Sequence, residues 1–108
     1  MKDSIRKWLT EQFGEEEELI QGIYAEYVSS SVTKAAELEG ALASSDWEQV
    51  DRIAHTLKGN ALMTGDKEVA DKAIALRAAS KAADMAAAKP LADALGEMIR
   101  ELQRDVAP

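Results

Sequence analysis

DWEQVDRIAHTLKGNALMTG, residues 46–65, is the stretch that decides the fold. When it is drawn as a helix at about 100° per residue, its apolar side chains gather on one side with the spacing of a buried stripe. The stripe consists of Val50, Ile53, Ala54, Leu57, Ala61 and Thr64. The only histidine of the chain, His55, falls nearly opposite. The pattern therefore predicts a helix that buries one face and turns an imidazole toward solvent.

The polar side of this predicted helix carries His55 together with Glu48, Asp51, Arg52, Lys58, Gly59 and Leu62. Lys58 stands one helical turn after His55 and brings a cation close to the ring. Gly59 follows at i+4, where glycine destabilises a helix by about 1 kcal/mol relative to alanine. Because Gly59 has no side chain, it leaves space beside the imidazole on the face that a partner would approach.

Helices are also predicted before and after this stretch. The five predicted helices have the approximate bounds 3–13, 15–43, 46–63, 66–83 and 86–105. Asp3 or Ser4 is expected to cap the first helix, a residue of the Ser44-Ser45-Asp46 turn the third, and Asp66 the fourth. Gly65 suits the end of the third helix. Pro90 suits the first turn of the last helix, since a proline in a helix interior removes a hydrogen bond.

Each of these helices has its own apolar stripe. The stripes are Ile5, Trp8, Leu9 and Phe13; Ile20, Ile23, Tyr24, Tyr27, Ser31, Ala35, Leu38 and Leu42; Val69, Ala73, Leu76 and Ser80, flanked by Ala70 and Ile74; and Leu91, Leu95, Met98, Ile99 and Leu102. Short connections make successive helices antiparallel neighbours. We expect a single all-α domain over residues 1–108, an antiparallel up-down four-helix bundle with the short N-terminal helix as a lid over one end.

Composition and charge exclude several classes of function. The chain has no cysteine, which removes disulfides, thiolate metal sites and cysteine nucleophiles. Its net charge of −7 argues against nucleic acid as a partner. No apolar run approaches the length of a membrane span or of a signal peptide. We therefore expect a cytoplasmic protein that binds neither nucleic acid nor membrane.

The exposed histidine limits the chemistry further. One histidine without cysteine does not provide the convergent ligands of a zinc or di-iron site, so no metal is expected. No nucleophile and orienting acid stand at helical spacing around an enclosed cleft, as a catalytic triad would need. A neutral imidazole can itself be the nucleophile and form a covalent intermediate with a phosphoryl group. Lys58 would then balance the added negative charge.

The string Ala54-His55-Thr56-Leu57-Lys58-Gly59, followed by Gly65, resembles the hallmark of the histidine-phosphotransfer (HPt) domains of multistep phosphorelays. The resemblance runs from about residue 15 to 84 and weakly over the last helix. It separates the chain from the dimerisation helices of sensor kinases, where an acidic residue typically follows the histidine. Asn60, Ala78 and Ala79 depart from the family pattern, because a small residue and a glutamate are common at these places.

The resemblance implies a role for each residue of the motif. His55 is expected to accept a phosphoryl group at Nε2, Lys58 to stabilise that group, and Gly59 to leave room for the partner. The expected partners are receiver domains of a hybrid sensor kinase and of response regulators, whose aspartate and Mg²⁺ do the chemical work. The chain itself would need no cofactor and would be a carrier, without kinase or phosphatase activity.

The docking face is predicted around His55, with Leu62 as an apolar contact and three charged residues, Arg52, Asp51 and Glu48, at the rim. A monomer is expected, and a weak dimer through Leu62 or Trp8 is the alternative. The same face would also serve a different class of protein, a helical interaction module that binds a response regulator or another protein without carrying phosphate.

Overall fold

The computed structural model describes residues 1–107, and these contain five α-helices and no β-strand. The helices are α1 (Asp3–Phe13), α2 (Glu17–Ala43), α3 (Trp47–Leu62), α4 (Lys67–Lys81) and α5 (Met85–Arg104). The expected all-α class is therefore confirmed. None of these helices is long and apolar enough to cross a membrane, within the residues described.

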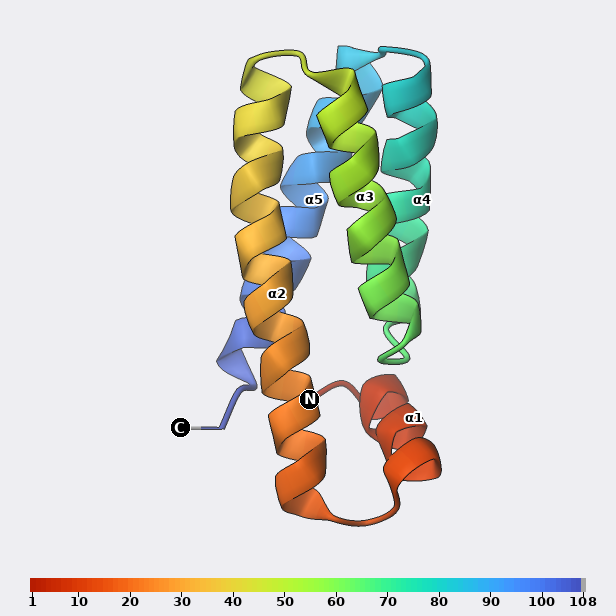
Figure 1. Ribbon diagram of the computed structural model, residues 1–108, viewed down its shortest axis with the longest axis vertical. Helices are drawn as coiled ribbons and strands as arrows, with labels where there is room; N and C mark the ends of the chain where they lie inside the picture. The colour runs from red at the N-terminus through yellow and green to blue at the C-terminus, as the bar shows by residue number, and fades with distance from the viewer. Residues whose placement is uncertain (108) are drawn as a thin grey trace.

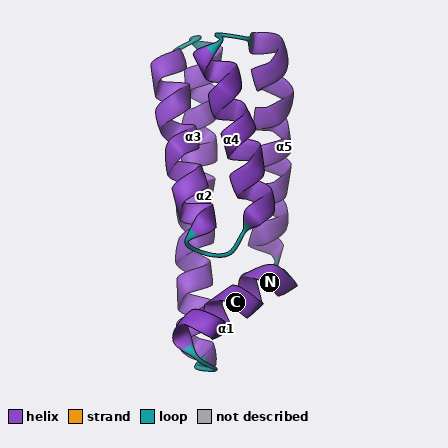
Figure 2. Cartoon of the chain, turned by 90° about the vertical axis from the view of Figure 1, so that its right-hand side faces the viewer, coloured by secondary structure: helices purple, strands orange, loops and turns teal. Residues whose placement is uncertain are grey.

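Four of the helices lie lengthwise beside one another, and successive ones run in opposite directions (Figure 1). α2 packs against α3 and α5, and α4 packs against the same two helices. The molecule is elongated, with extents of 43 × 24 × 17 Å. Helix α1 lies across the end where the α3–α4 turn is found (Figure 2). α3, the helix of the quoted stretch, is thus held between α2 and α4.

Three aspartates begin three of the helices. The carboxylates of Asp46, Asp66 and Asp84 accept hydrogen bonds from the backbone N–H groups three residues on, at the starts of α3, α4 and α5. Each satisfies a donor that the helix itself leaves unpaired. The prediction for α1 was wrong: its N-cap is Lys2, and no side chain caps it. The side chain of Lys2 bonds Asp66 instead.

Pro90 was expected in a first turn but lies in the second turn of α5, which begins at Met85. Its ring leaves the carbonyl of Ala86 without the usual partner four residues on. Both residues are exposed, so water can take the place of the missing N–H. The helix therefore continues through Pro90.

The core consists mainly of the predicted stripes. All six residues of the predicted stripe are buried, five of them in α3 and Thr64 in the turn after it, and so are Tyr24 and Tyr27 of α2. Three predicted core residues are instead exposed: Ile74 is 49% exposed, Phe13 44% and Trp8 37%. Ile74 lies beside the buried row of α4, outside the reach of α3 and α5. Phe13 ends α1, where little of the protein remains to cover it.

Helix α1 is attached through the α3–α4 turn. The indole Nε1 of Trp8 donates to the carbonyl oxygen of Met63 at 3.0 Å. Gly65 has φ +74, and a Cβ on it would lie 2.4 Å from the Cβ of Trp8. Glycine at this position therefore permits both the left-handed backbone and the close approach of α1.

Beneath this turn lies a polar cluster, formed by Asp66 with Lys2 and Tyr27. The Asp66 carboxylate is fully buried and accepts from Lys2 Nζ and from the Tyr27 hydroxyl, both at 2.7 Å. Burial, and then the nearby Asp66 carboxylate, raises the pKa of Tyr27. One carboxylate thus joins the start of α1, the middle of α2 and the start of α4.

Candidate functional site

His55 lies in the middle of α3, and the packing of that helix fixes the direction of its side chain. Ala54 and Leu57 beside it are fully buried, so the buried face of α3 cannot rotate without breaking the core. His55 is exposed on the other side. The predicted orientation of the imidazole toward solvent is therefore confirmed.

The imidazole has one polar neighbour from another helix. Nη1 of Arg77, on α4, lies 3.1 Å from Nδ1 of His55. Nε of the same guanidinium donates to Oδ1 of Asp51 at 3.0 Å. This guanidinium holds the pKa of Asp51 below its usual value. Asp51, Arg77 and His55 thus form a row of polar groups across the α3–α4 boundary, which we call the histidine cluster.

Arg77 was missed by sequence reasoning. It lies 22 residues after His55 on a different helix, and only the packing of α4 against α3 brings the two together. Ala78 and Ala79, which depart from the family pattern, lie directly after Arg77 in α4.

Lys58 and Gly59 lie one turn beyond His55 on α3. Lys58 is partly exposed and forms no ion pair with the residues described, so its ammonium group is available to an incoming anion. A Cβ added to Gly59 would meet no described atom within 4 Å. Internal packing therefore does not require glycine at this position.

The other predicted docking residues lie at two places on α3. Leu62 is 51% exposed, roughly 10 Å along the helix axis from His55 at 1.5 Å per residue. Arg52 and Glu48 are both exposed and pair with each other at 3.1 Å, about one turn and two turns before the histidine, respectively. Of the predicted rim charges, only Asp51 joins the histidine cluster.

A groove of about 610 Å³ lies between α2 and the end of α3, and Phe13 of α1 also lines it. Its lining includes Phe13, Leu19, Gly22, Ile23, Asn60 and Met63. Three of these are large exposed apolar side chains, with Phe13 44%, Leu19 42% and Met63 74% exposed. Sequence reasoning missed this groove, because it placed Phe13 in the core and did not consider Leu19 or Met63 as surface residues.

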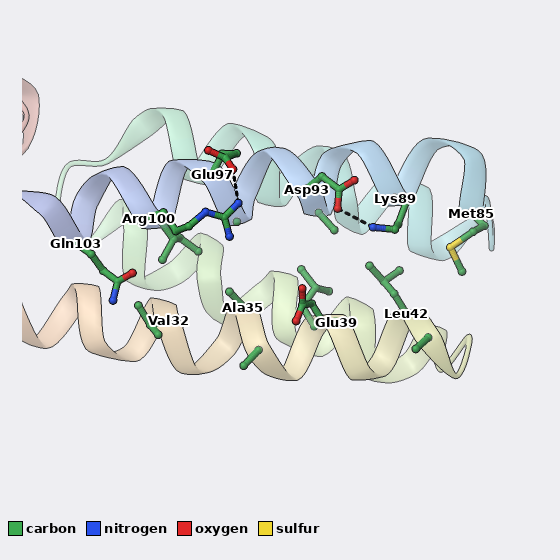
Figure 3. Close-up of a pocket in the computed structure, with 16 residues that line it drawn as sticks. Val32, Ala35, Glu39, Leu42, Met85, Lys89, Asp93, Glu97, Arg100 and Gln103 are labelled. Atoms are coloured by element: carbon green, nitrogen blue, oxygen red, sulfur yellow. Dashed lines mark hydrogen bonds and ion pairs between the residues drawn. The ribbon is translucent and has the colours of Figure 1, made fainter.

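A larger groove, of about 870 Å³, is lined by α2 and α5 alone (Figure 3). Its rim carries the pairs Lys89–Asp93 and Glu97–Arg100 from α5 (Figure 3). Since neither α3 nor α4 contributes to its lining, this groove is separate from the histidine cluster.

The chemistry open to the site is that of an exposed imidazole next to a lysine. Across residues 1–107, no three or more His, Cys, Asp or Glu side chains are grouped so that they could hold a metal ion. A neutral imidazole at near-neutral pH has one ring nitrogen with a lone pair, and such a nitrogen can attack phosphorus. His55 lines neither of the two grooves described above, so a partner would have to exclude water and supply the electrophile.

Comparison with known proteins gives one match. A family model described as "Hpt domain" matches residues 22–105, which is well over half of the chain. The match includes the histidine cluster and nearly all of α2 to α5, whereas α1 lies outside it. Neither a search of curated proteins nor a search of solved structures found a match.

Proposed function

This chain belongs to the Hpt domain family, and we propose that it carries a phosphoryl group on His55 between receiver domains of a multistep phosphorelay. The family implies a histidine-phosphotransfer role and receiver domains as partners. The proposal for this chain is finer: His55 accepts the group at Nε2 from a receiver aspartate and later passes it to another receiver. No kinase or phosphatase activity of its own is proposed.

The observation that carries the proposal is the position of the single histidine. His55 is exposed in mid-helix, Nδ1 faces Arg77, and Lys58 lies one turn further on with no ionic partner in residues 1–107. An acceptor on a convex surface suits a carrier, because a partner can reach the ring without any part of the bundle opening. Lys58 would balance the charge of the transferred group.

We propose that the receiver docks over Gly59 and Leu62 and along the groove between α2 and α3. The exposed apolar side chains there, Leu19, Leu62 and Met63, give the docking face an apolar centre. Arg52 and Glu48 would lie at its rim, and Asp51 would act through Arg77. Mg²⁺ would be bound by the receiver, as part of the machinery that transfers the group.

The remaining parts of the proposal concern the state of the protein. We propose that α2 to α5 act as an antiparallel four-helix bundle with α1 as its lid, and that the protein is a cytoplasmic monomer. The apolar residues exposed on the histidine face would then be covered only when a receiver binds. A stable dimer mass in light scattering would contradict the monomer.

The experiment is phosphoryl transfer from a phosphorylated receiver with Mg²⁺, using the native protein and His55→Gln. The native protein should gain acid-labile, base-stable phosphate, whereas His55→Gln should gain none. The variant should melt within a few degrees of the native protein, because substitutions at exposed sites usually change stability by about 0.5 kcal/mol or less. Uptake by His55→Gln would show that the acceptor is another residue.

The same experiment tests the alternative, an interaction module without phosphate. The exposed apolar groove favours binding in either case, so binding alone does not distinguish the two. If receivers bind the native protein tightly and none of them transfers phosphate, the interaction module is the better description.

A further inference from the structure

The two ring nitrogens of His55 have different surroundings. Nδ1 lies 3.1 Å from Nη1 of Arg77, while no hydrogen bond to Nε2 is formed by any part of residues 1–107. The Arg77 guanidinium is itself fixed at a second point by Asp51, at 3.0 Å. Arg77 and Asp51 are half-buried, with side-chain exposures of 25% and 33%. The contact with Nδ1 is therefore built by two helices.

A guanidinium limits which form of the ring can occupy this position. Arginine has only donors and stays protonated in proteins, so Nδ1 has to accept. An Nδ1 that accepts has a lone pair, and in a neutral imidazole the single proton then lies on Nε2. An imidazolium has a proton on both nitrogens and cannot accept from Arg77.

We propose that Arg77, held by Asp51, is a positioning residue that occupies Nδ1 of His55 and thereby shields that nitrogen from phosphorylation, which leaves Nε2 as the reacting atom once Arg77 has released the ring. This inference rests on the proposed function. A ring phosphorylated at Nε2 has a bare Nδ1 when it is uncharged, so it accepts from Arg77 just as the unphosphorylated Nε2–H form does. Arg77 thus fits both resting states of the carrier.

The transfer step itself requires Arg77 to release the ring. Nε2 can attack only after the ring proton has moved, through solvent, from Nε2 to Nδ1. The Nε2 lone pair then forms the N–P bond, and the P–O bond to the donor aspartate breaks with its electron pair moving to the carboxylate oxygen. The Nδ1 proton leaves to solvent, and Arg77 again donates to the bare Nδ1.

Arg77 has a different task from Lys58 in this scheme. Its guanidinium is bonded on the Nδ1 side of the ring and tethered to Asp51 there. The phosphoryl group would stand on the opposite nitrogen, and Lys58 on the same helix as His55 would be its cation. Removing Arg77 should therefore change which nitrogen reacts and how long the product lasts.

The first test measures the tautomer of unphosphorylated His55 by ¹⁵N NMR at about pH 8, where an ordinary imidazole is neutral. Four variants are compared with the native protein. Arg77→Met removes the donor, Arg77→Lys retains a cationic donor, Asp51→Ala removes the tether, and Arg100→Met removes an arginine of α5 outside the histidine cluster. The Nε2–H to Nδ1–H ratio should fall about tenfold in Arg77→Met, as expected for the loss of about 1.4 kcal/mol.

The other variants define the cause. The ratio should fall less in Asp51→Ala, recover in part in Arg77→Lys, and stay native in Arg100→Met. A merely structural role of Arg77 would change melting without changing this ratio. An unchanged ratio in Arg77→Met overturns the proposal.

The second test phosphorylates the same proteins with phosphoramidate, a small donor that needs no receiver. The native protein should give only the Nε2 isomer of phosphohistidine, identified by ³¹P and ¹⁵N NMR. Arg77→Met should also give the Nδ1 isomer, and its Nε2-linked phosphate should be lost about tenfold faster at a fixed pH. Native isomer composition and native lifetime in Arg77→Met overturn the proposal.

Both tests proceed without a receiver, so they separate this inference from the proposed function. A protein that accepts no phosphate from any receiver, yet has the expected tautomer and isomer, would contradict the relay role alone. A protein that works in a relay with an unchanged tautomer in Arg77→Met would contradict the role of Arg77 alone.

Discussion

The structure has two polar clusters near α3: the Asp66 cluster beneath the turn that follows the helix, and the histidine cluster in its middle. They differ in burial and in whether every charged group has a fixed partner. The Asp66 cluster is buried, and its carboxylate has a fixed partner for each contact: Lys2, Tyr27 and the Val69 N–H. The histidine cluster lies at the surface, and its outermost group, His55, is exposed. Both join separate helices, but only the second leaves a reactive atom within reach of another protein.

The difference shows how one small helical protein can separate stability from chemistry. Removing one partner of a buried charge is strongly destabilising, so we expect the Asp66 cluster to be sensitive to the loss of any of its partners. An exposed cluster contributes little to stability, because water replaces any partner that leaves. The histidine cluster is therefore free to exchange partners, which is what phosphoryl transfer requires.

The largest expected effect comes from breaking the buried cluster. Asp66→Ala should lower the free energy of unfolding by about 3–5 kcal/mol, because it leaves the buried Tyr27 hydroxyl without its acceptor, leaves Lys2 only the longer contact with Glu68 at 3.6 Å, and removes a helix cap. Urea unfolding measures this loss. Asp46→Ala and Asp84→Ala are matched controls, since both aspartates cap helices at exposed positions, and each should cost about 1 kcal/mol. Equal losses in all three variants would show that the buried network contributes nothing beyond a cap.

The next largest effect is expected on receiver binding and phosphoryl transfer, when a side chain is added at Gly59 on the docking face. Gly59→Gln should weaken receiver binding and slow transfer about 100-fold, a loss of about 2.7 kcal/mol, because its side chain would fill the space that the partner needs. Unfolding should show equal or greater stability, since glycine is the poorer helix former by up to about 1 kcal/mol. Calorimetric binding to an unphosphorylated receiver gives the affinity.

Two further glycines, Gly22 and Gly40 of α2, can be compared with Gly59 of α3. At both, as at Gly59, an added Cβ would meet no described atom within 4 Å outside the helix's own neighbouring backbone. Gly22 lines the groove between α2 and the end of α3, along which we propose that the receiver docks, and Gly22→Gln should weaken binding about tenfold. Gly40 lines neither groove and serves as the control, so Gly40→Gln should bind as the native protein does. Native binding by Gly59→Gln would mean that the glycine is merely tolerated there.

Lys58→Ala separates chemistry from docking on the same face. It removes the cation beside the phosphoryl group and creates no obstacle, so binding should fall little while transfer slows roughly 10- to 100-fold. That range follows from the 1.5–3 kcal/mol of a charge-assisted contact. Rapid-quench transfer rates measure it. A parallel loss of binding and rate would assign Lys58 to the docking surface.

The smallest expected effect is the pH dependence of the stability that the Asp51–Arg77 pair contributes. Arg77 holds the pKa of Asp51 below its ordinary value of 3.8. A folded-state pKa that lies below the unfolded one adds stability above the unfolded pKa, and this stability is lost as the pH falls through the folded pKa. Because the pair is partly exposed, we expect less than about 1 kcal/mol. An NMR titration of the Asp51 carboxyl should return toward 3.8 in Arg77→Met, and an unchanged titration would remove Arg77 as the cause.

The features that could be predicted from the sequence are those that depend on the spacing of apolar residues within a single helix. The helical class, the burial of Val50, Ile53 and Leu57, and the exposure of His55 all follow from periodicity within one helix. The contact of Arg77 with His55 depends on the register between α3 and α4, which no spacing along the chain encodes. The same holds for the Asp66 cluster: the pattern predicted the cap but not that Lys2 and Tyr27 would reach it. Phe13 and Ile74 were misplaced because a stripe does not reveal where neighbouring helices end.

The proposal that this protein is a carrier is tested most directly by following one phosphoryl group through it. The protein is phosphorylated by a labelled receiver, purified from that donor, and mixed with a second, unphosphorylated receiver and Mg²⁺. We predict that the label leaves His55 and appears on the aspartate of the second receiver, with the protein returned to its unphosphorylated form. Label that stays on the protein, or that is released as inorganic phosphate without ever reaching a receiver, would contradict a carrier role.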